Sequence, residues 1–587
     1  MKITLSLKKT PPSGLFFYEG IISLGFVLLF ASWMTSVHFL PWNSWHNEML
    51  AFASILLLSA VLVKDGFDHG RRTILLPMIS WPIGLLCVIV AIQASTGRIL
   101  FMGDAAVLSF YFLLCLLALI LGYAATSSNG RGSTSDTDLV DKFAVLILVG
   151  GMCSAIVAVV QALDIWEFGD WITRLQSLRR PGGNLAQPNQ LATLLLFSIA
   201  STAYLFESRR LSVLVALPIA AVLLCGLSVT ESRSGVLGLL VMAAWWFIKR
   251  RRLAFTLPMP AVGLWLIFFG CCFWFWPTCF NFIQEGGWTE STVTTVTQVN
   301  TSDSGRLVIW QQLWQAVLIR PWFGWGLREV SSAQNAVIHT YSEGLPVTYA
   351  HNIVMDLAVG IGVPLTLLLV GTALVWLWRR ASAANDRLTW YCIAVAIPFG
   401  VHSMLEYPFA YAYLLAPVMM LLGILEARLA PGWGVRIRWW PAATAWVLIS
   451  AAMVWSVIEY IPIEEDFRIL RFEAMHIGQT PRGYERPHIV MLTQLDALLH
   501  GGRIVPKPGM SADEVELARK VALRFPWPAT QNRYAQSLAL NGNPNEAIRQ
   551  LLVIRTLHGE AAYTQIKAGW TVLAHEKYPQ LQTLKLP

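Results

Sequence analysis

Charged residues are scarce in this chain: Asp, Glu, Lys and Arg make up 13% of its 587 residues. A soluble protein carries roughly twice that fraction, so an ordinary soluble fold is excluded. Hydrophobic residues make up 55%, and the mean hydropathy is +0.54. The apolar residues form blocks of about 17 to 25, the length that an α-helix needs to cross a bilayer. Short alternating strands, which a membrane β-barrel needs, are lacking. The sequence therefore predicts an all-α polytopic membrane protein.

The sequence also lacks the signals of disulfide bonds, of a cleaved signal peptide and of nucleic-acid binding. The eight cysteines lie almost entirely within apolar blocks, so we interpret them as small core residues and not as a disulfide or metal framework. The first apolar block, Phe16 to about Phe39, is too long for a signal peptide, and no small-residue cleavage site follows it. The net charge of +8 does not indicate nucleic-acid binding, because the basic residues occur in short clusters beside apolar blocks.

The apolar blocks predict thirteen membrane spans, centred near residues 27, 56, 84, 115, 152, 198, 220, 242, 265, 365, 396, 419 and 450. Lys and Arg clusters fall on alternate connecting segments, and such clusters mark the cytoplasmic side. We therefore expect a bacterial inner-membrane protein with a cytoplasmic amino terminus. The odd number of spans places the carboxyl terminus in the periplasm.

Four domains follow from this topology. Residues 1–277 hold the first nine spans, 278–351 form a large periplasmic loop, 352–460 hold the last four spans, and 461–587 form a periplasmic tail. Long insertions in compact proteins are usually functional or disordered. Apolar residues at helical spacing from Arg306 to Ile319 favour a functional loop.

The tail is predicted to be a small helical domain. Residues 532–554 indicate a helix, a turn and a second helix, with the small residues Ala535, Gly542 and Ala547 where a tetratricopeptide-like (TPR-like) hairpin packs closely. A generic helical cap is the alternative.

Polar side chains gather at one predicted face of the membrane, where each costs free energy. They come from separate loops and span ends on the periplasmic side: Arg180, Gln187, Arg233, Arg306, His351, His402, Glu406 and Tyr407. The orientation was assigned from the opposite face, so this gathering is an independent observation.

The two best placed arginines suit an anion. Arg233 lies between two apolar blocks with almost no loop, and Arg306 follows a polar run at the start of the loop helix. A guanidinium stays charged at any working pH and matches phosphate oxygens with a planar fork. The alternatives are structural: Arg233 reaching the interface or pairing with Glu231, and Arg306 pairing with Asp303.

Histidine and amide side chains complete the set. His351 can accept a proton near neutral pH, although a single interfacial histidine is more often structural. No second His or carboxylate stands at ligand spacing, so no metal is expected. His402 and Glu406 share a helical face, either as a cavity wall or as a satisfied pair. The shaped turn at 182–190 offers amides for sugar hydroxyls or phosphate at a helix start.

Together these motifs resemble the bacterial O-linked protein oligosaccharyltransferases, the pilin-glycosylating branch of the O-antigen ligase and polymerase superfamily. The matching stretches run in order along the chain: Pro41–Glu48, Arg180–Gln190, Ser232–Gly235, Ser304–Arg306 with Trp310, Pro321–Gly326, His351–Asn352 and His402–Pro408. The resemblance extends into the tail. Each motif is weak alone, but the ordered set with the Asn184–Gln190 run is specific to this branch.

The resemblance implies a glycosyltransferase that needs neither metal nor cofactor. Its donor would be an oligosaccharide on undecaprenyl pyrophosphate, a lipid of the membrane, and its acceptor a Ser or Thr of an exported protein such as pilin. By the same resemblance Arg233 and Arg306 would stabilise the pyrophosphate, and His351 would act as general base with inversion. Gln187 and Tyr407 would bind the donor, with Arg180 and His402 as further donor contacts.

One departure and three rivals remain. Relatives often place an acid just before a glycine about eleven positions after the His-Asn pair, where this chain has no acid in Ala358–Gly362. If that acid assists the base in relatives, this protein either lacks it or uses Asp356 or Glu406 instead. An O-antigen ligase acting on lipid A core, or an O-antigen polymerase, would share the donor and the arginine and histidine chemistry. A transporter of lipid-linked glycans would carry charges inside both halves of its spans.

Overall fold

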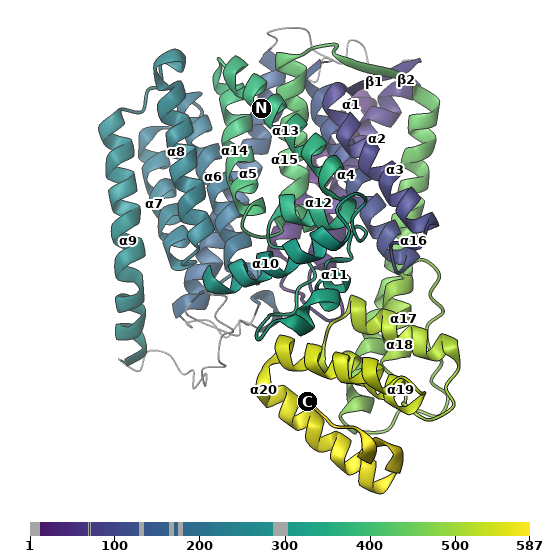
Figure 1. Ribbon diagram of the computed structural model, residues 1–587. Helices are drawn as coiled ribbons and strands as arrows, with labels where there is room; N and C mark the ends of the chain where they lie inside the picture. Colours follow the sequence, from purple (N-terminus) through teal and green to yellow (C-terminus); the bar gives the residue numbers. More distant parts are fainter. Residues whose placement is uncertain are drawn as a thin grey trace. The chain divides into compact units, whose positions relative to one another are not determined.

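The computed structural model describes residues 12–68, 70, 72–127, 134–163, 169–173, 180–285 and 303–587 (Figure 1). Twenty α-helices account for most of these residues. The chain divides into two compact units: unit 1 comprises residues 1–84, 111–298 and 373–451, and unit 2 comprises 85–110, 299–372 and 452–587. Four helices pass from one unit into the other, namely α3 (Trp81–Ser95), α4 (Met102–Ser127), α13 (Val363–Ala383) and α16 (Trp439–Ala474).

Unit 1 is a bundle of long apolar helices. Its own helices are α1 (Pro12–Met34), α2 (Trp45–Asp68), α5 (Thr134–Leu163), α6 (Pro188–Glu207), α7 (Val213–Val229), α8 (Arg233–Leu253), α9 (Met259–Glu285), α14 (Arg387–Ser403) and α15 (Ala412–Leu429). Helix α6 packs against α5, α7, α8 and α14. In α6 and in α15, 78% of the most apolar 18-residue stretch of the helix is buried inside the protein, whereas in α9 only 6% of that stretch is buried. Helix α6 is therefore central and α9 peripheral in this unit.

Close backbone contact joins α15 to the part of α4 in unit 1. A Cβ on Gly122 would lie 1.9 Å from the Met420 carbonyl oxygen, and one on Gly423 would lie 2.0 Å from the Leu119 oxygen. Only glycine fits at either position. Small residues at helix contacts are typical of membrane bundles, because van der Waals packing drives association there.

Each of the thirteen predicted span centres falls inside a helix. Within the described part of the chain, nine helices are long and apolar enough to cross a membrane. Glu19–Met34 of α1 and the whole of α7 are shorter apolar segments. Helix α14 has 17 residues, and α8 ends in the basic run Lys249–Arg252. Thirteen spans and the orientation of the chain therefore stay predictions.

The all-α prediction missed one small sheet. Strand β1 (Thr73–Pro77) pairs antiparallel with β2 (Gly434–Arg438), and Thr73 lies opposite Arg438. The two strands are far apart in the sequence. The apolar residues of β1 directly precede the apolar block of the third predicted span, so the sequence did not distinguish the strand from that span. The mostly helical character is otherwise as predicted.

Unit 2 packs the large loop and the tail together. Its helices are α10 (Asp303–Ile319), α11 (Val330–Val337), α12 (Ile353–Ile361), α17 (Thr493–Gly501), α18 (Ala512–Arg524), α19 (Pro528–Leu540) and α20 (Pro544–Glu576). The predicted loop helix is confirmed by α10. Buried Ile338, after α11, packs on Val553 and Leu557 of α20.

The predicted helix–turn–helix in the tail is confirmed by α19 and α20, while its likeness to TPR repeats stays a prediction. Ala535 and Ala547 are fully buried, as close packing requires. Gly542 was assigned a packing role too, and that was wrong: a Cβ there would meet open space, and its φ of +88° shows that it shapes the turn. Helix α20 is also interrupted at Gly559.

A buried ion pair fixes the tail to the start of α4. The Arg524 guanidinium donates two hydrogen bonds of 2.7 Å to the Asp104 carboxylate, and the two side chains are 8% and 0% exposed. Such a bidentate pair is strong and directional. Arg328 lies 3.7 Å from the same carboxylate.

We predict that Arg524→Leu lowers the free energy of unfolding by about 3–5 kcal/mol, because it leaves a buried carboxylate short of its partner. Arg519→Leu on the same helix is the control, since its pair with Glu516 is exposed and worth about 0–1 kcal/mol. Denaturation of the purified protein in detergent measures both. If both variants lowered the free energy of unfolding equally, the buried ion pair would contribute no more to stability than the exposed one.

Candidate functional site

The start of α6 is built by a shaped turn whose amides are mostly engaged inside the protein. Asn184 is buried, and its amide donates to the carbonyl oxygens of Met34 (2.7 Å) and Trp171 (3.0 Å). Its side-chain oxygen accepts from the Thr173 N–H at 3.1 Å. Asn184 therefore holds the turn in place and is not available to a ligand. The sequence had suggested that the amides of residues 182–190 bind sugar hydroxyls or phosphate, and Asn184 does not fit that expectation.

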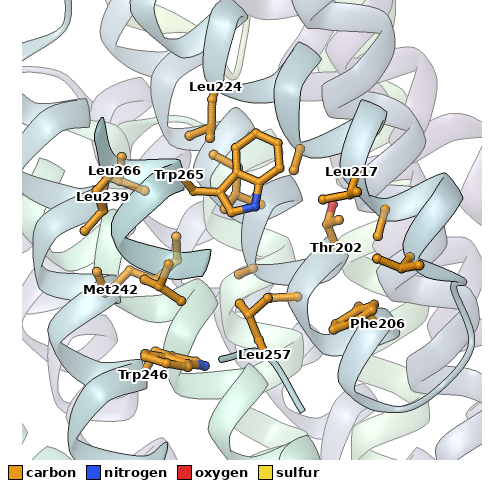
Figure 2. A pocket seen from close by; sticks show the side chains of 18 of the residues that line it. Thr202, Phe206, Leu217, Leu224, Leu239, Met242, Trp246, Leu257, Trp265 and Leu266 are labelled. Carbon is orange, nitrogen blue, oxygen red and sulfur yellow. The ribbon is translucent and has the colours of Figure 1, made fainter. Parts of the chain in front are cut away.

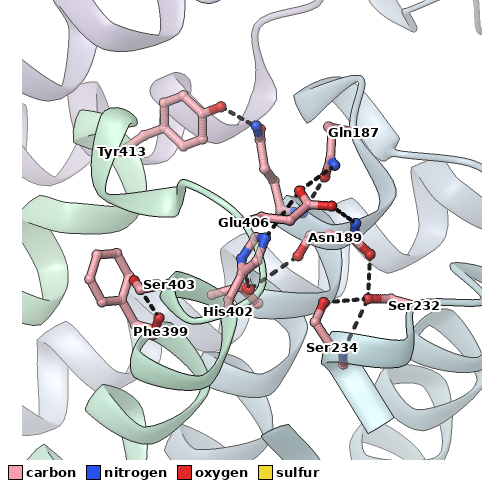
Figure 3. A network of polar contacts seen from close by, with 12 residues as sticks. Gln187, Asn189, Ser232, Ser234, Phe399, His402, Ser403, Glu406 and Tyr413 are labelled. Carbon is pink, nitrogen blue, oxygen red and sulfur yellow. Dashed lines mark hydrogen bonds and ion pairs between the residues drawn. The ribbon is translucent and has the colours of Figure 1, made fainter. Parts of the chain in front are cut away.

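Gln187 caps α6 and begins a polar network (Figure 3). Its side-chain oxygen accepts from the Gln190 N–H at 2.7 Å, and its amide donates to Glu406 Oε2 at 3.1 Å. Asn189 donates to Glu406 Oε1 at 2.7 Å and accepts from the Ser232 hydroxyl at 2.6 Å. The Glu406 carboxylate thus joins the start of α6 to the turn after α14, and Asn189 extends the connection to the N-cap of α8.

His402 supports this network from inside. Its Nδ1 lies 2.8 Å from the Thr193 hydroxyl, its Nε2 lies 3.6 Å from Glu406 Oε2, and its side chain is 1% exposed. The predicted proximity of His402 and Glu406 is confirmed. His402 is buried and does not face solvent, and its Nε2 makes no hydrogen bond to the carboxylate. Tyr407 follows directly, and its half-buried ring stacks on Tyr411 with centroids 5.9 Å apart.

Two arginines flank the turn between α7 and α8. The Arg180 guanidinium donates to the Thr230 carbonyl oxygen at 3.3 Å. Arg233 is exposed and is the first residue of α8, directly after Ser232, whose hydroxyl caps the helix by accepting from the Gly235 N–H. A helix start carries partial positive charge, so this corner of unit 1 favours an anion.

Arg306 and His351 belong to unit 2 and lie on neighbouring elements there. Arg306 is in the first turns of α10, and Trp310 follows four positions later on the same helical face. The Trp310 indole N–H donates to the Ala350 carbonyl oxygen at 2.9 Å. Ala350 immediately precedes His351, so α10 connects the arginine to the histidine.

The backbone around His351 is held on both sides. His351 has a φ of +53°, a left-handed conformation that costs a residue with a side chain roughly 1–2 kcal/mol. The Ala350 N–H donates to Asp356 Oδ2 at 3.0 Å, while Asn352 caps α12 by accepting from the N–H groups of Val354 and Met355. These bonds fix the residues before and after His351 and so maintain its strained conformation.

Asp356 is enclosed, and its protonation is altered accordingly. Burial raises the pKa of the Asp356 carboxyl to about 8, while the Ala350 N–H and the Arg328 charge act in the opposite direction. A protonated carboxyl keeps an acceptor oxygen, so the bond to Ala350 does not require the charge. The sequence offered Asp356 only as a substitute acid; the contact with Ala350 left no pattern that could have revealed it.

The structure thus gathers the predicted residues in two clusters. Arg180, Gln187, Arg233, His402 and Tyr407 lie around the network of unit 1, and Arg306 and His351 lie together in unit 2. Sequence reasoning gave no separate role to Asn189 or Ser232, which the structure places at the centre of the first cluster. Among the described residues, no group of three His, Cys, Asp or Glu side chains is arranged to hold a metal.

Comparisons with known proteins cover both clusters. Three family models match: one described as O-antigen ligase over residues 218–370, one as virulence factor membrane-bound polymerase, C-terminal, over 390–573, and one as protein glycosylation ligase over 181–206. Apart from Arg180, every predicted site residue lies in one of these ranges.

Two relatives come from Acinetobacter baylyi. The chain is 27% identical over 547 residues to a general O-oligosaccharyltransferase, a match that covers 92% of each protein. It is 28% identical over 392 residues to a ComP-specific O-oligosaccharyltransferase, which covers 65% of this chain and 67% of that protein. These comparisons confirm the resemblance predicted from the sequence motifs.

We predict that Glu406→Leu destabilises the protein by about 1–3 kcal/mol for each amide donor left unsatisfied, since both Gln187 and Asn189 lose their acceptor. Glu406→Gln keeps the volume and one acceptor oxygen and should lose less. Thermal unfolding in detergent ranks the variants. The control is Glu465→Leu, which breaks an exposed pair with Arg468; if it proved as harmful as Glu406→Leu, the network would have no special role.

Proposed function

Because this chain is a glycosyltransferase that resembles an O-oligosaccharyltransferase over 92% of its length, we propose that it glycosylates exported proteins. In this proposal an oligosaccharide moves as one block from undecaprenyl pyrophosphate to a Ser or Thr hydroxyl of an acceptor such as pilin. The transfer takes place at the periplasmic face of the bacterial inner membrane. The observation that carries the proposal is the connection of Arg306 to His351 through Trp310 and Ala350.

That connection supplies a base and a cation on one scaffold. In the proposed step the acceptor oxygen attacks the anomeric carbon, and its proton passes to His351. The bond from the anomeric carbon to the pyrophosphate oxygen breaks, and undecaprenyl pyrophosphate leaves. A single displacement inverts the anomeric configuration. Arg306 stabilises the negative charge that develops on the leaving group and needs no metal to do so.

We assign the donor head group to the polar network of unit 1. Arg233 is exposed at a positively polarised helix start, which suits a pyrophosphate. Arg180 adds a second cation, and Gln187 and Tyr407 orient the donor. His402 is buried beside the Glu406 carboxylate and would act on the donor only through it.

The tail is proposed to help present the acceptor protein. Paired helices such as α19 and α20 offer a groove for an extended segment. The tail belongs to the same compact unit as His351. An acceptor bound there would be held on the scaffold that carries the proposed base.

An O-antigen ligase or polymerase is the second candidate. It is favoured by the matching models, two of which are described as O-antigen ligase and as membrane-bound polymerase. Both share the donor with the first candidate, so the acceptor in the product distinguishes them.

We expect the purified protein to transfer glycan to a Ser-rich, pilin-like acceptor from undecaprenyl-pyrophosphate oligosaccharide with a chelator present, seen as a glycan-sized increase in intact protein mass. His351→Ala should lower the rate by about 10²–10⁴-fold, the usual contribution of a general base. Arg306→Ala should lower it by about 10²–10³-fold.

Two variants in unit 2 serve as controls for this assay. Arg320→Ala removes an exposed arginine just after α10, and His500→Ala removes an exposed histidine in the tail; neither should change the rate. Glycan on lipid A core, or lengthened glycan on the donor, with none on protein would replace the proposal by the second candidate.

Asp356 is predicted to act as a positioning residue for His351. Asp356→Leu removes the acceptor of the Ala350 N–H, and releasing a conformation that costs about 1–2 kcal/mol should lower kcat roughly tenfold with little change in KM. Asp356→Asn keeps an acceptor oxygen and should retain most activity. If the Asn variant were as slow as the Leu variant, the charge of Asp356 and not its hydrogen bond would be what matters.

A further inference from the structure

An apolar groove lies between α6, α7, α8 and α9 in unit 1 (Figure 2). Its volume is about 170 Å³, and leucines such as Leu224 and Leu239 line it together with the indole rings of Trp246 and Trp265. The lining includes one hydroxyl, that of Thr202, which already donates to the Ser198 carbonyl oxygen at 2.8 Å. The indole N–H groups of the lining residues Trp246 and Trp390 are buried and have no hydrogen-bond partner among the described residues. The groove otherwise presents hydrocarbon and aromatic faces and suits a mainly apolar ligand.

The groove and the polar network lie along the same two helices, and the groove extends toward the ends opposite the network, where Phe206 and Leu257 line it. Helices α6 and α8 carry the network at their first residues and the groove further along. Leu239 and Trp246 follow Arg233 by six and thirteen positions, which at 1.5 Å per residue places them roughly 9 and 20 Å below it along α8. This depth lies within the hydrocarbon core of a bilayer, which is about 30 Å thick.

An apolar groove in a bilayer does not select its occupant by hydrophobicity, because lipid chains are as apolar as the groove. To prefer one apolar chain over others, the groove must either match the shape of that chain or bind a chain whose head group is already held nearby. A polyprenyl pyrophosphate whose head lies at Arg233 would hold its chain beside the groove at a high effective concentration, an advantage that free phospholipid lacks. Stiff, methyl-branched isoprene units also gain dispersion contacts on flat indole faces.

The peripheral position of α9 leaves a route of entry. Only 6% of the most apolar 18-residue stretch of α9 is buried, and within unit 1 this helix packs mainly on α7. A chain can therefore enter sideways from the lipid and need not thread through a closed cavity.

We propose that this groove binds the polyprenyl chain of the donor and sets the preference of the enzyme for long-chain donors. The proposal rests on the proposed function, since it places the head group of that donor at Arg233. It goes beyond that function by assigning the chain a site of its own, separate from the reacting groups.

The test compares two donors that carry the same oligosaccharide on undecaprenyl or on geranyl pyrophosphate. Leu239→Trp fills the groove, and Ala243→Phe fills it more gently. Both should lower kcat/KM for the long donor tenfold or more and leave the short donor unchanged. The control is Leu240→Trp, whose position adjoins Leu239 but is 52% exposed; it should change neither. Thermal unfolding in detergent confirms that each variant is folded.

The outcomes separate the two proposals. Equal loss of rate with both donors, or an equal effect of the Leu240→Trp control, would overturn the groove assignment and indicate a structural lipid instead. If the wild type transferred glycan from neither donor to protein, the proposed function would fail. The groove would then be tested by photocrosslinking a diazirine-bearing polyprenyl pyrophosphate. Labelling of α8 that undecaprenyl pyrophosphate but not phospholipid competes away supports the groove, and equal competition by phospholipid overturns it.

Discussion

A carboxylate among apolar helices must be surrounded by donors, and Glu406 meets this requirement with groups from several elements. It accepts from the amides of Gln187 and Asn189 and lies beside His402. Through Asn189 the network reaches Ser232, the residue before Arg233. The placement of the exposed arginine thus depends on satisfying one acid, because a half-satisfied polar network in an apolar environment would cost more than it stabilises.

The same solution recurs elsewhere in unit 1. Buried Glu426 accepts from Arg380 and Trp376, and buried Glu207 accepts from the N–H groups of Thr256 and Leu257. Each of these acids joins segments far apart in the sequence. In a bundle whose apolar surfaces discriminate poorly between partners, such polar connections specify which helix ends meet. Buried acids of unit 1 such as Glu207 and Glu426 serve this connecting role, whereas other charges, such as Arg233, lie exposed.

The fold was predictable to the extent that it follows from local pattern. Apolar blocks located a helix at every predicted span centre, and helical spacing located α10 and the hairpin of α19 and α20. The β1–β2 pair was missed because its partners are over 350 positions apart. The candidate site residues could be selected from the sequence because each polar group at the predicted membrane boundary costs free energy. Their contacts could not be predicted, because the hydrogen bond from Trp310 to Ala350 and the acceptor role of Asp356 produce no periodic pattern in the sequence.

The two clusters lie in different units, and the proposed reaction assigns one substrate to each unit. The donor is an amphiphile with a charged head and a long apolar chain, and unit 1 offers an arginine at the start of α8 and an apolar groove further along that helix. The acceptor is a protein, and unit 2 holds His351 together with the tail, which the Arg524–Asp104 pair fixes to the start of α4. Under the proposed function, an acceptor bound by the tail would be held in the same unit as the proposed base. Under the proposed function, a precise position is needed where the proton would be transferred, whereas an apolar groove can hold the lipid chain without fixing its exact position.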